Sequence, residues 1–188
     1  MNRFHRWYCG TALWTREIGR VASWALQDVD LGADALEIGP GRGHTTELLR
    51  QRVDRLTTVE IDAKLADGVR ARFADAGNVA VETADATELP YEAERFTGAA
   101  CFTMLHHVPS AELQDRLLRE VHRVLRPGAV FAGSDSTPTL LFRLAHIRDT
   151  MVLVDPDTIG ARLEAAGFTD VSLKVDRGAF RFRARRRP

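Results

Sequence analysis

The chain has 188 residues, 45% of them hydrophobic, and its 26 Lys and Arg residues are balanced by 26 Asp and Glu residues. A chain of this size can bury a sizeable core, and we expect one domain spanning residues 1–188. A formal net charge of zero gives no overall field that would attract nucleic acid or an anionic membrane. The N-terminus has no apolar signal core, and no run approaches the roughly 20 apolar residues of a membrane span. We therefore expect a cytoplasmic protein without a membrane span.

The two cysteines, Cys9 and Cys101, do not form a disulfide framework, and no metal-ligand spacing accompanies them. Cys101 lies in an apolar stretch, where a small buried thiol is the expected structure. We predict no metal site.

The N-terminal segment contains all three tryptophans. From Trp14 onwards apolar side chains recur at helical spacing, for example at Ile18 and Ala25. This periodicity predicts a helix packed against the domain. We assign residues 1–30 to an N-terminal helical cap and residues 31–188 to a sheet and its helices.

The first predicted strand, residues 35–38, runs into a turn with glycines at 39, 41 and 43. Glycine lets the backbone adopt positive φ and removes the side chains that would keep a ligand away from the main chain. A helix over residues 45–53 follows, so the segment is typical of a strand, a nucleotide-binding loop and a helix. Alone, the G-x-G-x-G pattern is also compatible with a simple turn between a strand and a helix.

A second strand is predicted at residues 56–61, followed by Asp62 as the N-cap of a helix that ends at Gly77. Residues 78–82 return as a third strand. Strands that alternate with helical patterns indicate a parallel, doubly wound sheet, whose ligands bind beyond the carboxyl ends of the strands.

Three acidic residues, Glu37, Glu60 and Asp85, fall where these three strands end. Glu60 follows Gly41 at close to the separation of about 20 residues at which an acid after the second strand accepts hydrogen bonds from ribose hydroxyls. This spacing predicts an adenosine ligand. A carboxylate two residues before the first glycine would repel the pyrophosphate of a dinucleotide. The cationic sulfonium and ammonium groups of S-adenosyl-L-methionine suit three carboxylates better, so we favour this cofactor over NAD.

Five ordered segments resemble the motifs of class I S-adenosylmethionine-dependent methyltransferases, namely residues 36–43, 59–62, 84–86, 102–108 and 123–131. The resemblance covers nearly the whole chain. It implies an α/β fold of the Rossmann-like methyltransferase type, a doubly wound and mostly parallel seven-stranded sheet with a C-terminal antiparallel hairpin. It also implies methyl transfer from S-adenosyl-L-methionine, with S-adenosyl-L-homocysteine as product, but it does not name the acceptor.

The same resemblance assigns cofactor contacts to the glycine loop and to the ends of the second, third and fourth strands. The residues concerned are Glu37, Gly39, Pro40, Gly41, Gly43, Glu60, Ile61, Asp85, Ala86 and Thr103. Glu60 is expected at the ribose, and Asp85 with Ala86 at the adenine. Segments before the first strand often cap the cofactor in this superfamily, so Trp7 and Tyr8 are either lining residues of the site or packing residues.

Residues 96–105 predict a central fourth strand that runs into Thr-Met-Leu-His-His-Val-Pro at 103–109. Nucleobase amino-methylating enzymes carry Asn/Asp-Pro-Pro-aromatic at this position, and that motif is absent here. His106 and His107 are the natural candidates for a catalytic base that takes a proton from the acceptor. A histidine pair at this place is also common as loop structure in the superfamily. We prefer His107 because it is closer to the turn at Pro109.

Ser110 begins a helix with an apolar stripe, a turn follows at 126–128, and residues 130–133 form a fifth strand. Asp135, at the end of that strand, is either a turn-forming residue or a catalytic contact to the acceptor. Residues 137–154 break the alternation, and their leucines predict a short helix that covers the acceptor pocket or belongs to the core.

Asp155 is predicted to cap another helix, which Gly167 closes. A sixth strand is expected over 171–175. In the last strand, residues 180–185, phenylalanines take one face and arginines the other. We interpret the basic tail that follows as a solvated strand end rather than a phosphate site.

The predicted function is methyl transfer to a small-molecule acceptor. A protein or nucleic-acid methyltransferase, a non-catalytic S-adenosylmethionine-binding module and an NAD-linked oxidoreductase are the alternatives. Zero net charge and the small size of the chain argue against a nucleic-acid partner, and none is expected.

Overall fold

The computed structural model describes residues 11–137, 151–176 and 178–188. Its strands are β1 (Asp34–Ile38), β2 (Arg55–Glu60), β3 (Val79–Thr83), β4 (Phe96–Phe102), β5 (Leu125–Ser136), β6 (Phe168–Asp176) and β7 (Ala179–Arg186). Its helices are α2 (Ala12–Ala25), α3 (His44–Leu49), α4 (Ala63–Arg72), α5 (Ala111–Val124) and α7 (Pro156–Ala165), with a short 3-10 helix, η1, at Leu105–His107.

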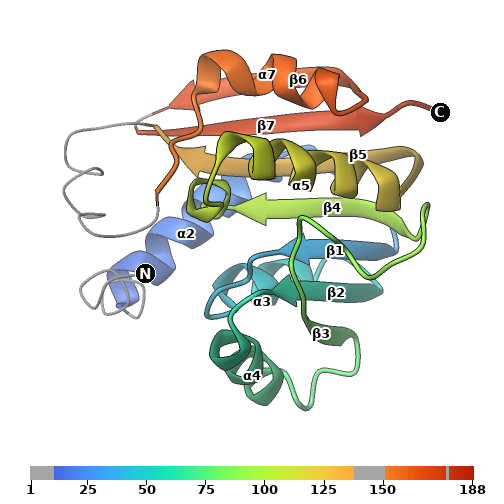
Figure 1. Cartoon of the computed structure of the whole chain (residues 1–188). Coiled ribbons are helices and arrows are strands. Elements are labelled where there is room, and N and C mark those ends of the chain that lie inside the picture. Colours follow the sequence, from blue (N-terminus) through green and yellow to red (C-terminus); the bar gives the residue numbers. More distant parts are fainter. Residues whose placement is uncertain (1–10, 138–150, 177) are drawn as a thin grey trace.

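The seven strands form one sheet in the order β3-β2-β1-β4-β5-β7-β6 (Figure 1). Neighbouring strands from β3 to β5 run parallel, whereas β7 is antiparallel to both β5 and β6. The predicted doubly wound sheet with a C-terminal antiparallel hairpin is confirmed. Its five parallel strands bring the ends of β1, β2, β3 and β4 to the same edge, where the predicted site residues lie.

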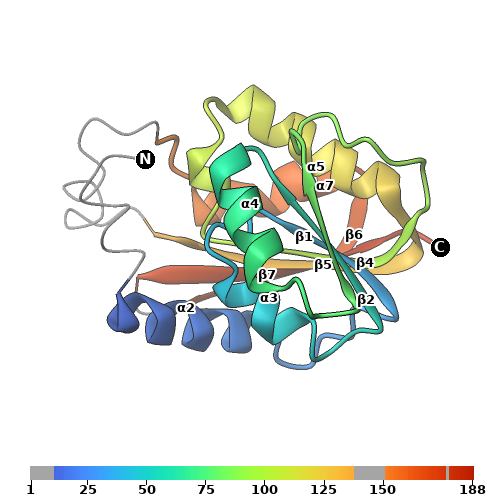
Figure 2. The ribbon, with the colours of Figure 1, turned by 90° about the horizontal axis from the view of Figure 1, so that it is seen from below.

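Helices α2 and α3 lie on one face of the sheet, and α5 and α7 lie on the other (Figure 2). Because strand side chains alternate, β1 serves both faces. Ala35 joins the core beneath α2 and α3, whereas Leu36 and Ile38 join the larger core beneath α5 and α7. The predicted N-terminal helix contributes Ile18 and Ala25 to the first core. Helix α2 therefore packs against the sheet through these core residues.

Two of the sequence predictions concern segments outside the described residues. Trp7 and Tyr8 precede the described chain, and most of the helix predicted within 137–154 falls in residues 138–150.

The alternation predicted for the last strand is confirmed. Phe180 and Phe182 are buried in the core beneath α5 and α7. On the opposite face the guanidinium of Arg181 lies over the Trp24 ring, 4.9 Å from its centroid, and donates to the Trp24 carbonyl. The last strand therefore fixes α2 against the sheet.

The helix starts predicted from capping residues are also confirmed. The Asp62 carboxylate accepts from the backbone N–H groups of Lys64 and Leu65 at the start of α4. Ser110 caps α5 and Asp155 caps α7 in the same way.

Two helices are shorter than predicted. α3 ends at Leu49 rather than at residue 53, because Asn78 Nδ2 donates to the carbonyl oxygens of Arg50 and Val53 and satisfies the end of the helix in a turn. α4 ends at Arg72, well before Gly77.

Strands β4, β5 and β6 also differ from the prediction, and β6 begins at Phe168 rather than at residue 171. β4 ends at Phe102 instead of residue 105, because Thr103 adopts a left-handed φ of 48° that leaves the extended conformation. The turn predicted at 126–128 is an irregularity inside β5, with Gly128 at a φ of 79°. Because β5 continues to Ser136, Asp135 is paired with Phe180 of β7. The interpretation of Asp135 as a turn-forming residue is therefore wrong.

Candidate functional site

The three glycines of the loop after β1 have left-handed φ angles of 68°, 56° and 79°. A Cβ on Gly39 would lie 2.9 Å from Cβ of Met104, and a Cβ on Gly43 would lie 2.9 Å from Cε2 of Phe73. A Cβ on Gly41 would meet no atom within 4 Å. The loop is therefore packed at both ends and open at Gly41, where its backbone is accessible to a ligand.

Glu60, the last residue of β2, is joined directly to this loop. Its Oε2 accepts from the Gly41 amide at 3.1 Å, and its Oε1 accepts from the Asp62 amide at 3.1 Å. Burial raises the pKa of this carboxyl, which is 7% exposed, although both amides oppose the shift. The next residue, Ile61, is 69% exposed. The end of β2 thus places an acid and an accessible apolar side chain at the rim of the loop.

Glu37 lies beneath the loop, not on its open side. Its Oε1 accepts from the Thr45 hydroxyl at 2.5 Å and its Oε2 accepts from the Thr46 hydroxyl at 2.6 Å. The side chain is fully buried, and burial raises its pKa while the threonine hydroxyls oppose the shift. Glu37 ties β1 to the first turn of α3. The two threonines were missed in the sequence, although they directly follow the glycine loop.

The turn after β3 lies beside the end of β2, because the Ala84 amide donates to the carbonyl oxygen of Glu60 at 3.2 Å. Asp85 is exposed, and its Oδ1 accepts from the Thr87 amide at 2.8 Å. Ala86 is buried. Asp85 and Ala86 therefore lie on the same edge of the sheet as Glu60.

Two further predicted cofactor residues support the same region through their backbones. The Pro40 carbonyl accepts from the Gly43 amide at 2.8 Å, which closes the glycine loop. The Thr103 amide donates to the Ser134 carbonyl at 2.8 Å, which joins the ends of β4 and β5.

The histidine turn η1 is fixed to β5 by Asp135. Asp135 Oδ1 lies 2.5 Å from Nδ1 of His106 and accepts from the Ser136 amide at 2.7 Å, while its Oδ2 accepts from the His106 amide at 3.2 Å. The carboxyl group of Asp135 thus binds both the backbone and the side chain of His106. Asp135 is fully buried and His106 is 3% exposed. The pair is an internal anchor for the turn.

His107 lies next to this anchor. Its ring centroid is 4.1 Å from that of His106, with the two rings tilted by 47°. Unlike His106, it is only partly buried. Of the two candidate bases, His107 is therefore the more accessible.

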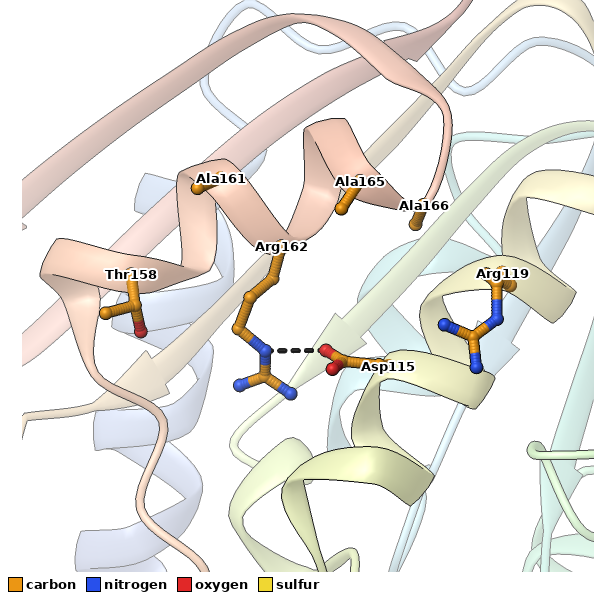
Figure 3. Close-up of a pocket in the computed structure, with 7 residues that line it drawn as sticks. All are labelled: Asp115, Arg119, Thr158, Ala161, Arg162, Ala165 and Ala166. Carbon is orange, nitrogen blue, oxygen red and sulfur yellow. Dashed lines mark hydrogen bonds and ion pairs between the residues drawn. The ribbon is translucent and has the colours of Figure 1, made fainter.

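A polar network from α5 and α7 holds the backbone of the turn. Gln114 Nε2 donates to the carbonyl oxygens of Leu105 and Val152, and Arg162 Nη1 donates to Gln114 Oε1 at 2.9 Å. Figure 3 shows that Arg162 also pairs with Asp115, at 2.6 Å, in a groove between α5 and α7. None of the predicted cofactor or acceptor residues lines this groove.

Met104 connects the histidine turn with the glycine loop. It lies two residues before His106, and its side chain fills the space beside Gly39. The structure thus brings the loop, Glu60, the Asp85 turn and the histidine turn to one edge of the sheet.

Nearby Cys101 is enclosed in the core. Burial, and secondarily the charge of Asp135, raises the pKa of its thiol well above the ordinary value. A thiol in this state is a poor nucleophile.

Within the described chain, no three His, Cys, Asp or Glu side chains gather in a way that could hold a metal ion. No described helix combines the length and the apolar character that crossing a membrane requires.

A family model described as a methyltransferase domain matches residues 36–133, just over half of the chain. The chain belongs to this methyltransferase family. The matched region includes the glycine loop, the end of β2, the Asp85 turn and the histidine turn. The resemblance to class I S-adenosylmethionine-dependent methyltransferases is confirmed, and membership implies S-adenosylmethionine as methyl donor.

The names of two curated relatives give two different methyl acceptors, ribosomal RNA and protein. The chain is 35% identical over 107 residues to a ribosomal RNA small subunit methyltransferase A of Parasynechococcus marenigrum (strain WH8102), covering 55% of this chain and 35% of that protein. It is 35% identical over 95 residues to a protein-L-isoaspartate O-methyltransferase of Nitrobacter winogradskyi, covering 48% of this chain and 44% of that protein. The chain thus matches less than half the length of either relative.

Solved structures show the same fold over nearly the whole chain. A SAM-dependent methyltransferase from Thermotoga maritima has a TM-score of 0.79 at 18% identity, covering 98% of this chain and 97% of that chain. The N-methyltransferase NodS from Bradyrhizobium japonicum WM9 has a TM-score of 0.73 at 16% identity, covering 96% and 99%.

Proposed function

We propose that this protein is an enzyme that transfers a methyl group from S-adenosylmethionine to a small-molecule acceptor. The proposal rests above all on one observation: the open glycine loop with Glu60 and the histidine turn meet at one edge of the sheet. Met104 joins the two parts, since it packs against Gly39 and precedes His106 by two residues.

The residues at this edge fit the cofactor. Glu60 would accept hydrogen bonds from ribose hydroxyls, Ile61 would cover the adenosyl group with its exposed side chain, and Asp85 with Ala86 would contact adenine. The backbone at Gly41 offers an approach without a side chain. When bound, S-adenosylmethionine supplies an already activated methyl group, so the protein contributes mainly orientation and exclusion of water.

The methionine side of the cofactor is assigned to the glycine loop. Gly39, Pro40 and Gly43 give this loop its shape, and Glu37 supports it from below. Thr103 closes the neighbouring strand end.

We propose that His107 is the general base that removes a proton from the acceptor. A base must reach the proton that it removes, and His107 is partly exposed whereas His106 is enclosed. Asp135 and His106 act through His107, because they fix the turn and the ring that it packs against. An acceptor that must lose a proton, such as a hydroxyl, a thiol or an acidic carbon, requires a general base of this kind.

Two observations favour a small molecule over a nucleic acid as the acceptor. The chain has no net charge, so it has no general attraction for a polyanion. Residues 103–109 lack the Asn/Asp-Pro-Pro-aromatic arrangement with which nucleobase amino-methylating enzymes hold a planar amino group. The relatives' names make ribosomal RNA and protein the competing acceptors.

An acceptor screen tests this proposal. Phenols, quinols, thiols and amines are incubated with S-adenosylmethionine and the protein, and release of S-adenosylhomocysteine is measured, with ribosomal RNA and unfolded protein as parallel arms. Turnover with a small molecule supports the proposal. Turnover with RNA or protein alone overturns the acceptor class. Tight cofactor binding without turnover in any arm indicates a non-catalytic binding module, and calorimetric binding of NAD instead would contradict the cofactor.

A further inference from the structure

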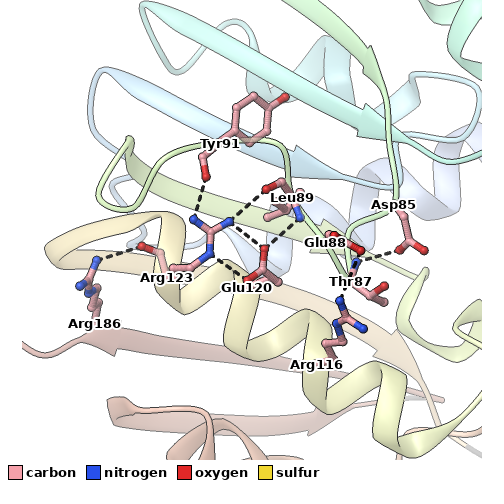
Figure 4. Close-up of polar contacts among 9 residues, drawn as sticks. All are labelled: Asp85, Thr87, Glu88, Leu89, Tyr91, Arg116, Glu120, Arg123 and Arg186. Carbon is pink, nitrogen blue, oxygen red and sulfur yellow. Dashed lines mark hydrogen bonds and ion pairs between the residues drawn. The ribbon is translucent and has the colours of Figure 1, made fainter.

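The segment between β3 and β4, residues 84–95, carries the Asp85–Ala86 turn but contains no helix of its own. Its conformation therefore depends on contacts with other elements. Figure 4 shows that two side chains of α5, Glu120 and Arg123, contact the backbone of this segment.

Glu120 and Arg123 lie one helical turn apart and form a two-pronged ion pair. Arg123 Nε lies 2.8 Å from Glu120 Oε1, and Arg123 Nη2 lies 2.8 Å from Glu120 Oε2. Both residues are partly buried. Bidentate pairs of this kind fix the orientation of both groups.

The pair binds both backbone polar groups of one residue in the segment. The Leu89 amide donates to Glu120 Oε2 at 2.9 Å, and Arg123 Nη2 donates to the Leu89 carbonyl at 3.0 Å. Arg123 Nη1 also donates to the Tyr91 carbonyl at 2.7 Å. The Leu89 side chain is buried in the core. Leu89 is thus fixed through its amide, its carbonyl and its side chain.

The fixation extends from Leu89 back to Asp85. The Glu88 amide donates to the Asp85 carbonyl at 3.0 Å, and the Thr87 amide donates to Asp85 Oδ1 at 2.8 Å. Ala86 and Thr87 are buried. Residues 85–89 therefore form one tight turn, whose far end is held by α5 and whose near end is held by the bond from Ala84 to Glu60.

We propose that the Glu120–Arg123 pair is a positioning device of the cofactor site, which holds the Asp85–Ala86 turn in the conformation that receives the adenosyl group. This inference rests on the proposed function. Neither residue is among the predicted cofactor contacts. The pair acts on affinity because the apparent dissociation constant rises as the fraction of molecules in the competent conformation falls.

The first test compares two arginines of α5 that contact the same segment. Arg123→Met keeps an apolar stem but removes every donor, and we expect it to bind S-adenosylhomocysteine about tenfold more weakly in titration calorimetry. Arg116→Met is the matched control. Arg116 pairs with Glu88 at 3.4 Å across an exposed surface, with side chains 51% and 82% exposed, and its loss should leave the affinity unchanged.

A double-mutant cycle separates positioning from general destabilisation. If Arg123 acts through the turn, its effect on affinity shrinks to less than about threefold in an Asp85→Ala background, because the contact that it positions is gone. An equal loss in both backgrounds would overturn the inference. Arg123→Lys, which keeps the charge and one donor direction, should recover part of the affinity.

The outcomes distinguish the two proposals. If the wild-type protein fails to bind S-adenosylhomocysteine, the proposed function is wrong. If the wild-type protein binds it and Arg123→Met has the same affinity as Arg116→Met, only the positioning role is wrong. Should Arg123→Met not fold, Glu120→Gln takes its place, since it keeps an acceptor for the Leu89 amide but loses the ion pair. Wild-type affinity in that variant overturns the inference.

Discussion

The carboxylate of Glu60 accepts a hydrogen bond of 3.1 Å from the amide of Gly41, a residue 19 positions earlier in the chain. This bond joins the end of β2 to the glycine loop at the point where the loop is open. The spacing that predicts a ribose contact therefore corresponds to a direct contact between the two motifs.

Replacing Glu60 by alanine should weaken binding of S-adenosylhomocysteine by about 2 to 4 kcal/mol, because charge-assisted hydrogen bonds to the ribose would be lost. Titration calorimetry measures the change. Glu82→Ala is the control, since Glu82 is an exposed carboxylate on the neighbouring strand β3, opposite Val59. Unchanged affinity in Glu60→Ala, with a normal melting curve, would show that Glu60 is not at the ribose.

The glycines of the loop should separate into two classes. Gly41→Ala should abolish most cofactor binding while costing only about 1 to 2 kcal/mol of folding stability, the strain of a left-handed alanine. Gly43→Ala should cost more stability, because its Cβ would also lie 2.9 Å from the Phe73 ring. Chemical unfolding and calorimetry on both variants provide the measurements. Equal stability losses would contradict the view that only Gly41 faces open space.

Loss of His107 should lower catalytic activity, whereas disruption of the Asp135–His106 anchor should lower folding stability. His107→Ala should lower kcat by about 10²-fold or more with unchanged cofactor affinity, as expected for a general base. Wild-type activity should fall at acidic pH, because an imidazolium cannot accept a proton, and this acidic limb should disappear in the variant. The measurement uses the best acceptor from the screen.

Asp135→Asn should instead lower stability by about 1 to 3 kcal/mol. The carboxyl group accepts from the His106 amide with one oxygen and from the Ser136 amide with the other, whereas an asparagine side chain has only one acceptor oxygen. Thermal unfolding measures this loss. For the preceding prediction, wild-type turnover of His107→Ala from pH 5 to 9 would show that His107 is not a general base and that catalysis depends on positioning of the substrates alone.

Asp34 lies at the edge of the sheet opposite the candidate site, and it should make the stability of the protein depend on pH. Burial alone would raise its pKa, but hydrogen bonds from Arg95 at 2.5 Å and Arg55 at 2.8 Å outweigh burial and hold the pKa below its ordinary value. A lowered carboxyl pKa stabilises the fold above the unfolded value of about 3.9, and this contribution is lost as pH falls through the folded pKa.

Asp34→Asn should therefore be less stable than the wild type near neutral pH, and the difference should narrow as the pH drops below about 4. Urea unfolding across this range measures it, and cofactor affinity should be unchanged because Asp34 begins β1, far from the glycine loop. A difference that stays constant down to acidic pH would show that ionisation of Asp34 is not its source.

Elements with local signals could be predicted from the sequence. Alternating phenylalanines and arginines define β7, Asp62, Ser110 and Asp155 mark helix starts, and the glycine run marks the loop. These features depend on neighbours within a few residues, so periodicity and capping chemistry are sufficient to place them. The spacing between Gly41 and Glu60 is likewise a feature of the sequence alone, and it predicts an adenosine ligand.

Contacts between residues far apart in the chain could not be predicted in this way. Adjacent histidines look alike in a sequence, but strand register brings Asp135, 29 residues away, to His106 and leaves His107 accessible. Arg123 lies in a recognisable motif, yet its contact with Leu89 depends on how α5 packs over the segment after β3. Such contacts follow from the packing of whole elements, which no local pattern encodes.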